Sequence, residues 1–326
     1  MAEGNVNMNG YGESSEAQGN EDSVANCKKA FHHDQLIHVS KFSVTHLPPR
    51  FRDMAIVSAI YALARLVVMI QVPAEGKPDN EKCSHSVESF EALDADEARK
   101  ATGRIKYVEM VESIHNQVCS CPECQSRPVE DRETEFSRVV VVTATHNICN
   151  VDITKLVCRL NYDDMGDIPV DLYCCSIKTF DVSRDRCELY CDIHDVNLRN
   201  DLFENIKSFA SLNTSLYEKY RNQENLDLLV IISHPHGLEK RVSVGKLLDV
   251  HTSNGWLPNT LYTQYFYGTP TCRGSSGAPV YVLGREKVWT NHPHWGYHLG
   301  RGFSAHEWED VTDNLKRLIK TMAVKK

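Results

Sequence analysis

The sequence predicts an all-β fold, with strands on both sides of one helical segment. Residues 139 to 142 are four consecutive valines, a composition typical of a buried strand. In residues 185 to 191, DRCELYC, apolar side chains alternate with polar ones, which indicates a strand with one buried face. Residues 198 to 224 follow these strands and carry apolar residues at helical spacing, including Leu202 and Ile206. At 326 residues the chain is long enough for one two-lobed fold with a substantial core or for two domains.

The segments before the valine run have distinct patterns. Residues 1 to 35 are rich in Gly, Asn, Ser and Glu without an apolar core, which predicts a disordered acidic tail. Residues 55 to 72 are the longest apolar stretch but are interrupted by Arg65. We therefore expect a helix that runs into a strand, LVVMIQV, rather than a membrane span. A further strand is expected at residues 101 to 110.

The composition argues against some classes of partner. Hydrophobic residues make up 41% of the chain and charged residues 25%, as in ordinary soluble globular proteins. The formal net charge of -8 argues against nucleic acid or an anionic membrane as a partner. No secretory signal opens the sequence, so we expect a cytoplasmic protein, with a nuclear location left open.

The decapeptide TCRGSSGAPV, residues 271 to 280, carries the candidate nucleophile, Ser276. Small residues beside this serine leave room for a substrate carbonyl, and the backbone N–H groups of Gly274 and Ser276 are candidate donors for an oxyanion hole. A serine hydroxyl needs a base before it attacks a carbonyl at neutral pH. The alternative interpretation of this segment is a polar turn in front of a strand.

His146 is the candidate base. It follows the predicted valine strand in the sequence TATH, residues 143 to 146, so that a rigid element would hold its ring. Histidine titrates near neutral pH, which suits it to take a proton from serine and return it.

These two segments resemble those of the trypsin-like serine peptidases of the chymotrypsin fold. TATH is similar to the Thr-Ala-Ala-His segment that carries the base in that family, and GSSGAP to the Gly-Asp-Ser-Gly-Gly-Pro segment that carries the nucleophile. Cys272 lies where secreted members have a cysteine, and His294, Trp295 and Gly296 resemble the Ser-Trp-Gly of the family's substrate cleft. Pro270 lies where the family lines its primary specificity pocket, which implies no preference for Lys or Arg side chains.

The resemblance implies two six-stranded antiparallel β-barrels with the site between them. It predicts a lead-in helix and a first barrel over residues 36 to 198, and a linker between the barrels over residues 199 to 225. The second barrel and a C-terminal helix are expected over residues 226 to 326, the helix beginning with EWED at residue 307.

The resemblance is closer to the intracellular HtrA-like members than to the secreted digestive enzymes. Residues 228 to 248 are similar to the hairpin that opens their second barrel, and we expect His234 and His236 to be exposed in its turn. Ser275 replaces the aspartate that pairs with a newly cut N-terminus in secreted members. Activation by that route is therefore not expected.

The family order of His, Asp and Ser implies a carboxylate between the base and the nucleophile, and Asp185 is our choice. It begins the alternating strand, as the family's aspartate begins an alternating segment. Asp192 is the second choice, and Asp181 and Asp195 fit less well.

The twelve cysteines are expected to be reduced thiols in a protein without a secretory signal. His115, Cys119, Cys121 and Cys124 offer four soft ligands within a short run, which makes them candidate zinc ligands. Structural zinc sites usually join two separated ligand pairs, so the pattern favours a metal-free loop. No cofactor is expected.

The sequence thus predicts a serine endopeptidase that acts on protein or peptide substrates through an acyl-enzyme. One alternative is a catalytically silent peptidase-like protein that binds peptides in the same cleft. The other is an interaction protein organised by zinc at the cysteine loop.

Overall fold

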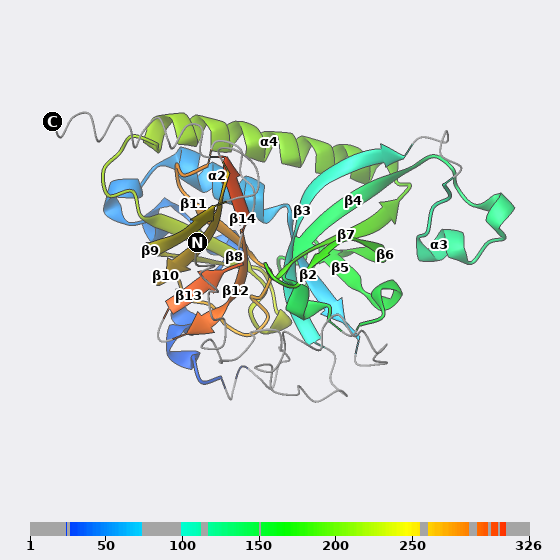
Figure 1. Cartoon of the computed structure of the whole chain (residues 1–326), viewed down its shortest axis with the longest axis horizontal. Helices are drawn as coiled ribbons and strands as arrows, with labels where there is room; N and C mark the ends of the chain where they lie inside the picture. The colour runs from blue at the N-terminus through cyan, green and yellow to red at the C-terminus, as the bar shows by residue number, and fades with distance from the viewer. Residues whose placement is uncertain are drawn as a thin grey trace, which may run out of the picture.

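The computed structural model describes residues 24, 27–73, 99–111, 117–149, 151–254, 260–286, 292–298, 301–305 and 307–310. They form two antiparallel β-barrels that lie side by side, with one long helix across both (Figure 1). No helix in this described part has the length and hydropathy needed to cross a bilayer.

The first barrel is closed by the strand order β2-β3-β4-β7-β6-β5, with β5 pairing back to β2. Its strands are β2 Val67–Val72, β3 Arg99–Val111, β4 Phe136–Thr143, β5 Val157–Leu160, β6 Val170–Asp181 and β7 Arg186–Ile193. The predicted valine run forms the centre of β4 and is fully buried. In the β4–β7 ladder Thr143 pairs with Cys187, which brings the end of β4 beside the start of β7.

The second barrel closes in the order β9-β8-β11-β12-β13-β10, because β10 also pairs with β9. Its strands are β8 Leu228–Ser233, β9 Arg241–Asn254, β10 Thr260–Tyr267, β11 Pro279–Val282, β12 His292–His298 and β13 Arg301–Ser304. The predicted fold of two six-stranded antiparallel barrels is confirmed.

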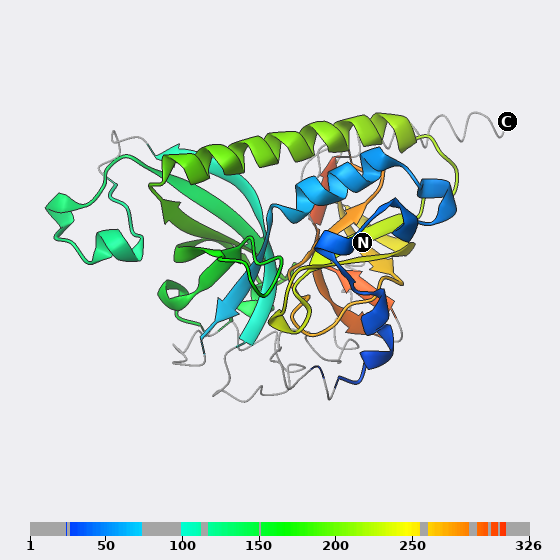
Figure 2. The same ribbon diagram turned by 180° about the vertical axis from the view of Figure 1, so that it is seen from behind.

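Helix α4, Val196–Tyr220, connects the barrels and lies along both of them (Figure 2). Its buried residues include Leu202, Phe209 and Leu216, seven residues apart, so one stripe of the helix faces the protein. Asp195 caps the helix, its side chain accepting hydrogen bonds from two backbone N–H groups of the first turn. The predicted linker, residues 199 to 225, is thus one continuous helix as far as Tyr220.

Helix α2, Met54–Ala64, runs directly into β2, as predicted from residues 55 to 72. It packs against α4 (Figure 2). The Asp53 side chain caps α2 by accepting from Ala55 N–H, and it also binds Lys219 and Tyr220 near the end of α4. These contacts hold the start of α2 against the end of α4.

The ends of the chain differ from expectation. Within the predicted tail, Ala30–Gln35 form a 3-10 helix. The lead-in then runs along the second barrel, because strand β1, Ile37–His38, pairs with β9.

The predicted C-terminal helix is wrong for its first residues, since Glu307–Asp310 form strand β14. Within β10, only Phe266 and Tyr267 pair with β13, which leaves Thr260 to Thr263 to pair with β14. The remainder of that predicted helix lies outside the described residues.

Candidate active site

His146 lies in the short 3-10 helix Thr145–Asn147, which directly follows strand β4. Its side chain is 4% exposed. Thr145 fixes this turn to the β6–β7 hairpin by donating its hydroxyl proton to the backbone oxygen of Asp181 at 3.0 Å. The rigid strand and this hydrogen bond set the position of the ring.

Asp185 ends the turn between β6 and β7 and holds His146 at two points. Its Oδ2 lies 2.7 Å from the ring Nδ1 of His146, and its Oδ1 accepts the backbone N–H of the same residue at 2.9 Å. The backbone of Asp185 is left-handed, with φ of 51°. Both carboxylate oxygens are therefore committed to positioning one histidine.

Ser276 comes from the second barrel, in the segment that leads into β11. Its Oγ is hydrogen-bonded to Nε2 of His146. Since an ionised carboxylate only accepts hydrogen bonds, Nδ1 of His146 carries its proton and Nε2 is left as the acceptor for the Ser276 hydroxyl. The backbone oxygen of Trp295 is a second acceptor, 3.0 Å from the same Oγ. The structure thus brings together Asp185, His146 and Ser276 from two barrels.

The nucleophile segment has two glycines with left-handed backbones. Gly274 has a φ of 88° and Gly277 a φ of 85°. A Cβ on Gly277 would lie 2.2 Å from the backbone oxygen of Thr102, so the first barrel leaves room only for glycine there. The backbone N–H groups of Gly274 and Ser276 donate to no described residue. Their role as oxyanion donors stays a prediction.

Two residues that sequence reasoning did not identify hold the nucleophile segment from the first barrel. Thr102 of β3 donates its hydroxyl proton to the backbone oxygen of Gly274 at 2.7 Å, and its N–H donates to the backbone oxygen of Ser276 at 2.9 Å. Asn147 donates its side-chain N–H to the same oxygen at 3.1 Å. A threonine in a strand and an asparagine in a turn carry no sequence signal for this role.

Of the residues predicted to bind substrate, His294 and Trp295 contact the nucleophile segment. His294 is anchored within the second barrel, where its Nδ1 lies 2.5 Å from the Tyr267 hydroxyl. The backbone of His294 exchanges hydrogen bonds of 2.7 Å with Gly277 and Ala278, so β12 runs beside the nucleophile segment. Trp295 and Gly296 follow on β12, and Pro270 is buried after the end of β10.

The three other aspartates considered have separate roles in the structure. Asp192 binds the guanidinium of Arg138 at 2.7 Å and accepts the backbone N–H of Ser120 at 3.1 Å. Asp181 pairs with Arg184 within the β6–β7 hairpin, and Asp195 caps α4. Asp185 instead binds His146 through both carboxylate oxygens, so the geometry favours it among the four.

The expectation that His234 and His236 are exposed turn residues is wrong, because both are buried. The His234 ring stacks on Tyr162 and donates from Nδ1 to the backbone oxygen of Leu238 at 2.9 Å. Burial, followed by the nearby Lys240 ammonium, lowers the pKa of His234 to about 3, so its ring is neutral at pH 7. His236 contacts the N-terminal segment, which covers this turn.

Three of the four predicted zinc candidates lie together, but the fourth partner is different. Cys119, Cys121 and Cys124 form a group with His194, whose ligand atoms all lie within 4.8 Å of one another. His115 lies outside the described residues. His194 follows β7 and is remote in sequence from the three cysteines, which is why the sequence pattern alone did not include it.

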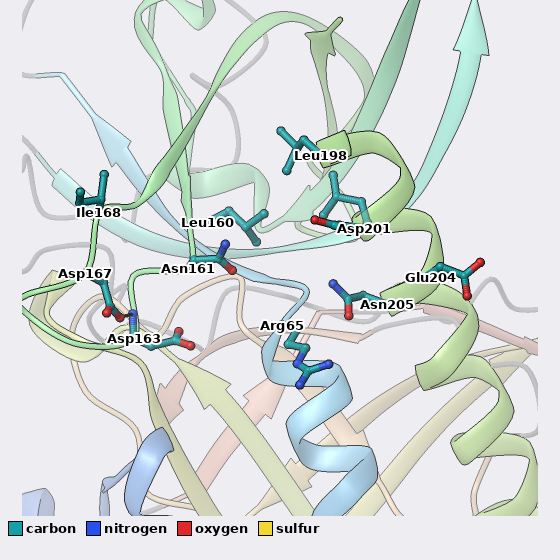
Figure 3. A pocket seen from close by; sticks show the side chains of 11 residues that line it. Arg65, Leu160, Asn161, Asp163, Asp167, Ile168, Leu198, Asp201, Glu204 and Asn205 are labelled. Carbon is teal, nitrogen blue, oxygen red and sulfur yellow. Dashed lines mark hydrogen bonds between the residues drawn. The ribbon is translucent and has the colours of Figure 1, made fainter. Parts of the chain in front are cut away.

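A separate pocket of about 590 Å³ lies between the first barrel, the end of α2 and the start of α4 (Figure 3). Acidic side chains line it, among them Asp163, Asp167 and Asp201, together with Arg65 from the end of α2. None of the three hydrogen-bonded site residues lines this pocket. We assign it no part in the reaction.

No protein-family model matches the sequence, and no curated protein sequence matches it. Among solved structures, the active form of the Rv3671c protease from M. tuberculosis shares 13% identity, with a TM-score of 0.41 over 81% of this chain and 86% of that chain. The HtrA-type protease AlgW with a tripeptide shares 12% identity, with a TM-score of 0.38 over 76% of this chain and 58% of that one. Likenesses this distant transfer no residue role. The two closed barrels described above give this chain the fold of the trypsin-like serine peptidases.

Proposed function

We propose that this protein is a serine endopeptidase that cleaves protein substrates through an acyl-enzyme. The observation that carries the proposal is the hydrogen-bonded chain from Asp185 through His146 to Ser276. A histidine held by a carboxylate and in contact with a serine hydroxyl is the arrangement that activates serine as a nucleophile. The first barrel contributes Asp185 and His146 to this row of hydrogen bonds, and the second barrel contributes Ser276.

In the first half of the reaction, Ser276 Oγ forms a bond to the carbonyl carbon of the substrate while His146 Nε2 takes the hydroxyl proton. The backbone N–H groups of Gly274 and Ser276 stabilise the resulting oxyanion. When the C–N bond breaks, His146 gives that proton to the leaving amine. Asp185 keeps the ring oriented and stabilises its positive charge throughout.

In the second half, water attacks the acyl-enzyme. His146 takes a proton from this water as its oxygen bonds to the acyl carbon, and it returns the proton to Ser276 Oγ as the ester bond breaks. The products are a carboxylic acid and the regenerated serine, so the cycle needs no cofactor.

The substrate backbone is proposed to lie beside β12. The backbone oxygen of Trp295 is 3.0 Å from Ser276 Oγ, so a peptide carbonyl that reaches this serine passes next to His294, Trp295 and Gly296. Pro270 contributes no charge to the expected specificity pocket. We therefore propose that cleavage after small or apolar residues exceeds cleavage after Lys or Arg.

The test is cleavage of an unfolded protein substrate by the purified wild-type chain and by Ser276→Ala. The wild type is expected to release peptides, and Ser276→Ala to lose at least about a thousand-fold in rate because no hydroxyl remains to form the acyl-enzyme. Ser211→Ala, an exposed serine on α4, is the matched control and should cleave at the wild-type rate.

The proposal is wrong if Ser276→Ala cleaves as fast as the wild type. A wild-type chain that binds unfolded peptides without cleaving them would instead support the silent, peptide-binding alternative. Sequencing of the released peptides gives the residue before each cut and tests the predicted apolar preference in the same experiment.

A further inference from the structure

Four metal-ligating side chains from three separate segments meet beside the nucleophile segment. Cys27 and His33 belong to the N-terminal segment, His236 to the turn between β8 and β9, and Cys272 to the stretch just before Ser276. Their ligand atoms all lie within 4.8 Å of one another. Nothing in the peptidase reaction requires this group.

The distances within the group are close to the edges of a tetrahedral metal site, two of the three being slightly shorter. Cys27 Sγ is 3.6 Å from Cys272 Sγ, and His33 Nε2 is 3.2 Å from Cys272 Sγ. His236 Nε2 is 3.2 Å from His33 Nε2. Zinc bonds of about 2.3 Å to sulfur and about 2.0 Å to nitrogen give tetrahedral edges of about 3.3 to 3.8 Å.

The surrounding backbone fixes this arrangement. His236 has a left-handed backbone, with φ of 59°, and its N–H donates to the backbone oxygen of Arg273 at 2.5 Å. The Lys29 N–H donates to Cys27 Sγ at 3.4 Å, as groups around a metal site hydrogen-bond to its ligands. The ligand set is therefore held by hydrogen bonds outside it, as in structural metal sites.

We propose that Cys27, His33, His236 and Cys272 bind one zinc ion, which fastens the N-terminal segment to the nucleophile segment. Two thiolates and two neutral imidazoles are a ligand set that tetrahedral zinc takes. The zinc also supports the site, because Cys272 and Ser275 form one turn: the Ser275 N–H donates to the backbone oxygen of Cys272 at 3.0 Å. Ser276 follows this turn directly.

A second group of four side chains supports a second zinc site, independently of the first. Cys121 Sγ lies 3.3 Å from His194 Nε2, and Cys119 and Cys124 complete the group on the excursion between β3 and β4. Backbone N–H groups donate to two of the sulfurs, from Cys121 to Cys119 Sγ and from Cys124 to Cys121 Sγ.

This excursion has little apolar core of its own. Its buried apolar cluster consists of the three cysteines and Phe136, with Val111 packed against it. Helix α3, Pro122–Gln125, lies in this excursion to the side of the first barrel (Figures 1 and 2). We infer that zinc bound by the three cysteines and His194 organises the excursion, because so small a cluster buries too little surface to do so.

The third cysteine group differs from both. Cys174 Sγ lies 3.6 Å from Cys158 Sγ and 3.4 Å from Cys191 Sγ, but all three are in the apolar core of the first barrel. No described histidine or carboxylate joins them. We interpret this group as core packing.

The test is the zinc content of the purified full-length chain, expressed with zinc and freed of unbound metal. We expect two zinc ions per chain in the wild type. Cys27→Ser and His33→Ala should each retain one, as should Cys121→Ser, and the double variant Cys27→Ser, Cys121→Ser should retain none. Cys175→Ser, a half-buried cysteine outside both groups, is the control and should retain two.

The two proposed zinc sites are tested independently of each other. The first is overturned if Cys27→Ser and His33→Ala keep the wild-type zinc content, or if peptide mapping finds a Cys27–Cys272 disulfide. The second is overturned if Cys121→Ser keeps the wild-type content. A wild-type chain without zinc overturns both. Metal content does not depend on peptidase activity, so these results leave the proposed function to its own test.

Discussion

At the scale of single residues, the most informative feature is the way Asp185 holds His146. One carboxylate oxygen accepts from the ring and the other from the backbone N–H of the same residue. Asp185 has a left-handed backbone, which aspartate tolerates better than most residues. Such backbones collect at functional sites, where the surroundings hold a side chain in one direction.

Asp185→Asn is expected to lower kcat by about ten-thousand-fold, because an amide favours the wrong tautomer of His146. The fold should survive, since the replacement has nearly the same shape. Steady-state kinetics on a peptide substrate, with a thermal unfolding curve, measures both. Asp195→Asn is the matched control, because asparagine caps a helix as well as aspartate does. Equal losses in the two variants would remove the special role of Asp185.

Thr102 is expected to act as a positioning residue. Its hydroxyl donates to the backbone oxygen of Gly274 and accepts from the N–H of His234 at 3.0 Å. Thr102→Val removes both hydrogen bonds at constant shape, and we expect kcat to fall by about ten-fold to a hundred-fold while KM changes little. Thr102→Ser restores the hydroxyl and should recover most of kcat. A loss that serine fails to recover would point to packing alone.

At the scale of elements, strand β7 directly follows Asp185 and also stabilises the first barrel. Cys187, Leu189 and Cys191 face the core, as their alternation predicted. Glu188 points the other way and binds Lys106 at 2.7 Å and Arg186 at 2.9 Å. Burial raises the pKa of Glu188, but these cations outweigh it and lower that pKa from 4.5 to about 2.

This shift predicts a pH dependence of stability. A folded-state pKa below the unfolded value means that the stabilisation is complete above about pH 4.5 and is lost as the pH falls toward about 2. The shift corresponds to about 3 kcal/mol in the free energy of unfolding. Urea unfolding at about pH 6 and about pH 3 should show a difference between the wild type and Glu188→Gln that shrinks at the lower pH. An unchanged difference would contradict this account.

The sequence predicted elements well where the pattern is local. Strands β4 and β7 and helices α2 and α4 follow from runs or spacings that their own residues carry. The prediction was wrong where a segment's structure depends on a partner far away in the sequence. EWED has no strand pattern, but it forms a strand because it pairs with an edge of β10. His234 and His236 read as exposed turn residues because nothing nearby in sequence indicates that other segments cover them.

At the scale of the whole molecule, the candidate site depends on the two barrels meeting in one arrangement. The backbone of the nucleophile segment is held by Thr102 and Asn147 of the first barrel, and Gly277 lies so close to that barrel that a side chain would not fit. Two barrels that shifted apart would separate Ser276 from His146. The helix α4, which lies along both barrels, opposes such a shift.

Gly277→Ala tests this dependence. The new Cβ would lie 2.2 Å from both Thr102 O and Thr143 Oγ1, and alanine disfavours the left-handed backbone. We expect a loss of about 2 to 4 kcal/mol in the free energy of unfolding and a loss of peptidase activity. Gly166→Ala is the control, because nothing lies within 4 Å of its Cβ position. Wild-type stability in Gly277→Ala would show that the barrels need not approach so closely.

The candidate site was predictable only in part, because some of its residues are brought together by contacts between distant segments. His146 and Ser276 lie in short segments with recognisable neighbours, and Asp185 follows from chain order and an alternating strand. Thr102, Cys27, His33 and His194 gain their roles from contacts between segments far apart in the chain. No local sequence pattern distinguishes these residues, so they can be identified only from the structure.

The proposed activation of Ser276 can be tested by labelling with a fluorophosphonate, which reacts with an activated serine. Mass spectrometry of the labelled wild-type chain should find one adduct, on the peptide that contains Ser276. His146→Ala should abolish it, because the serine then has no base. An unlabelled wild-type chain, or an adduct on another residue, would contradict the account.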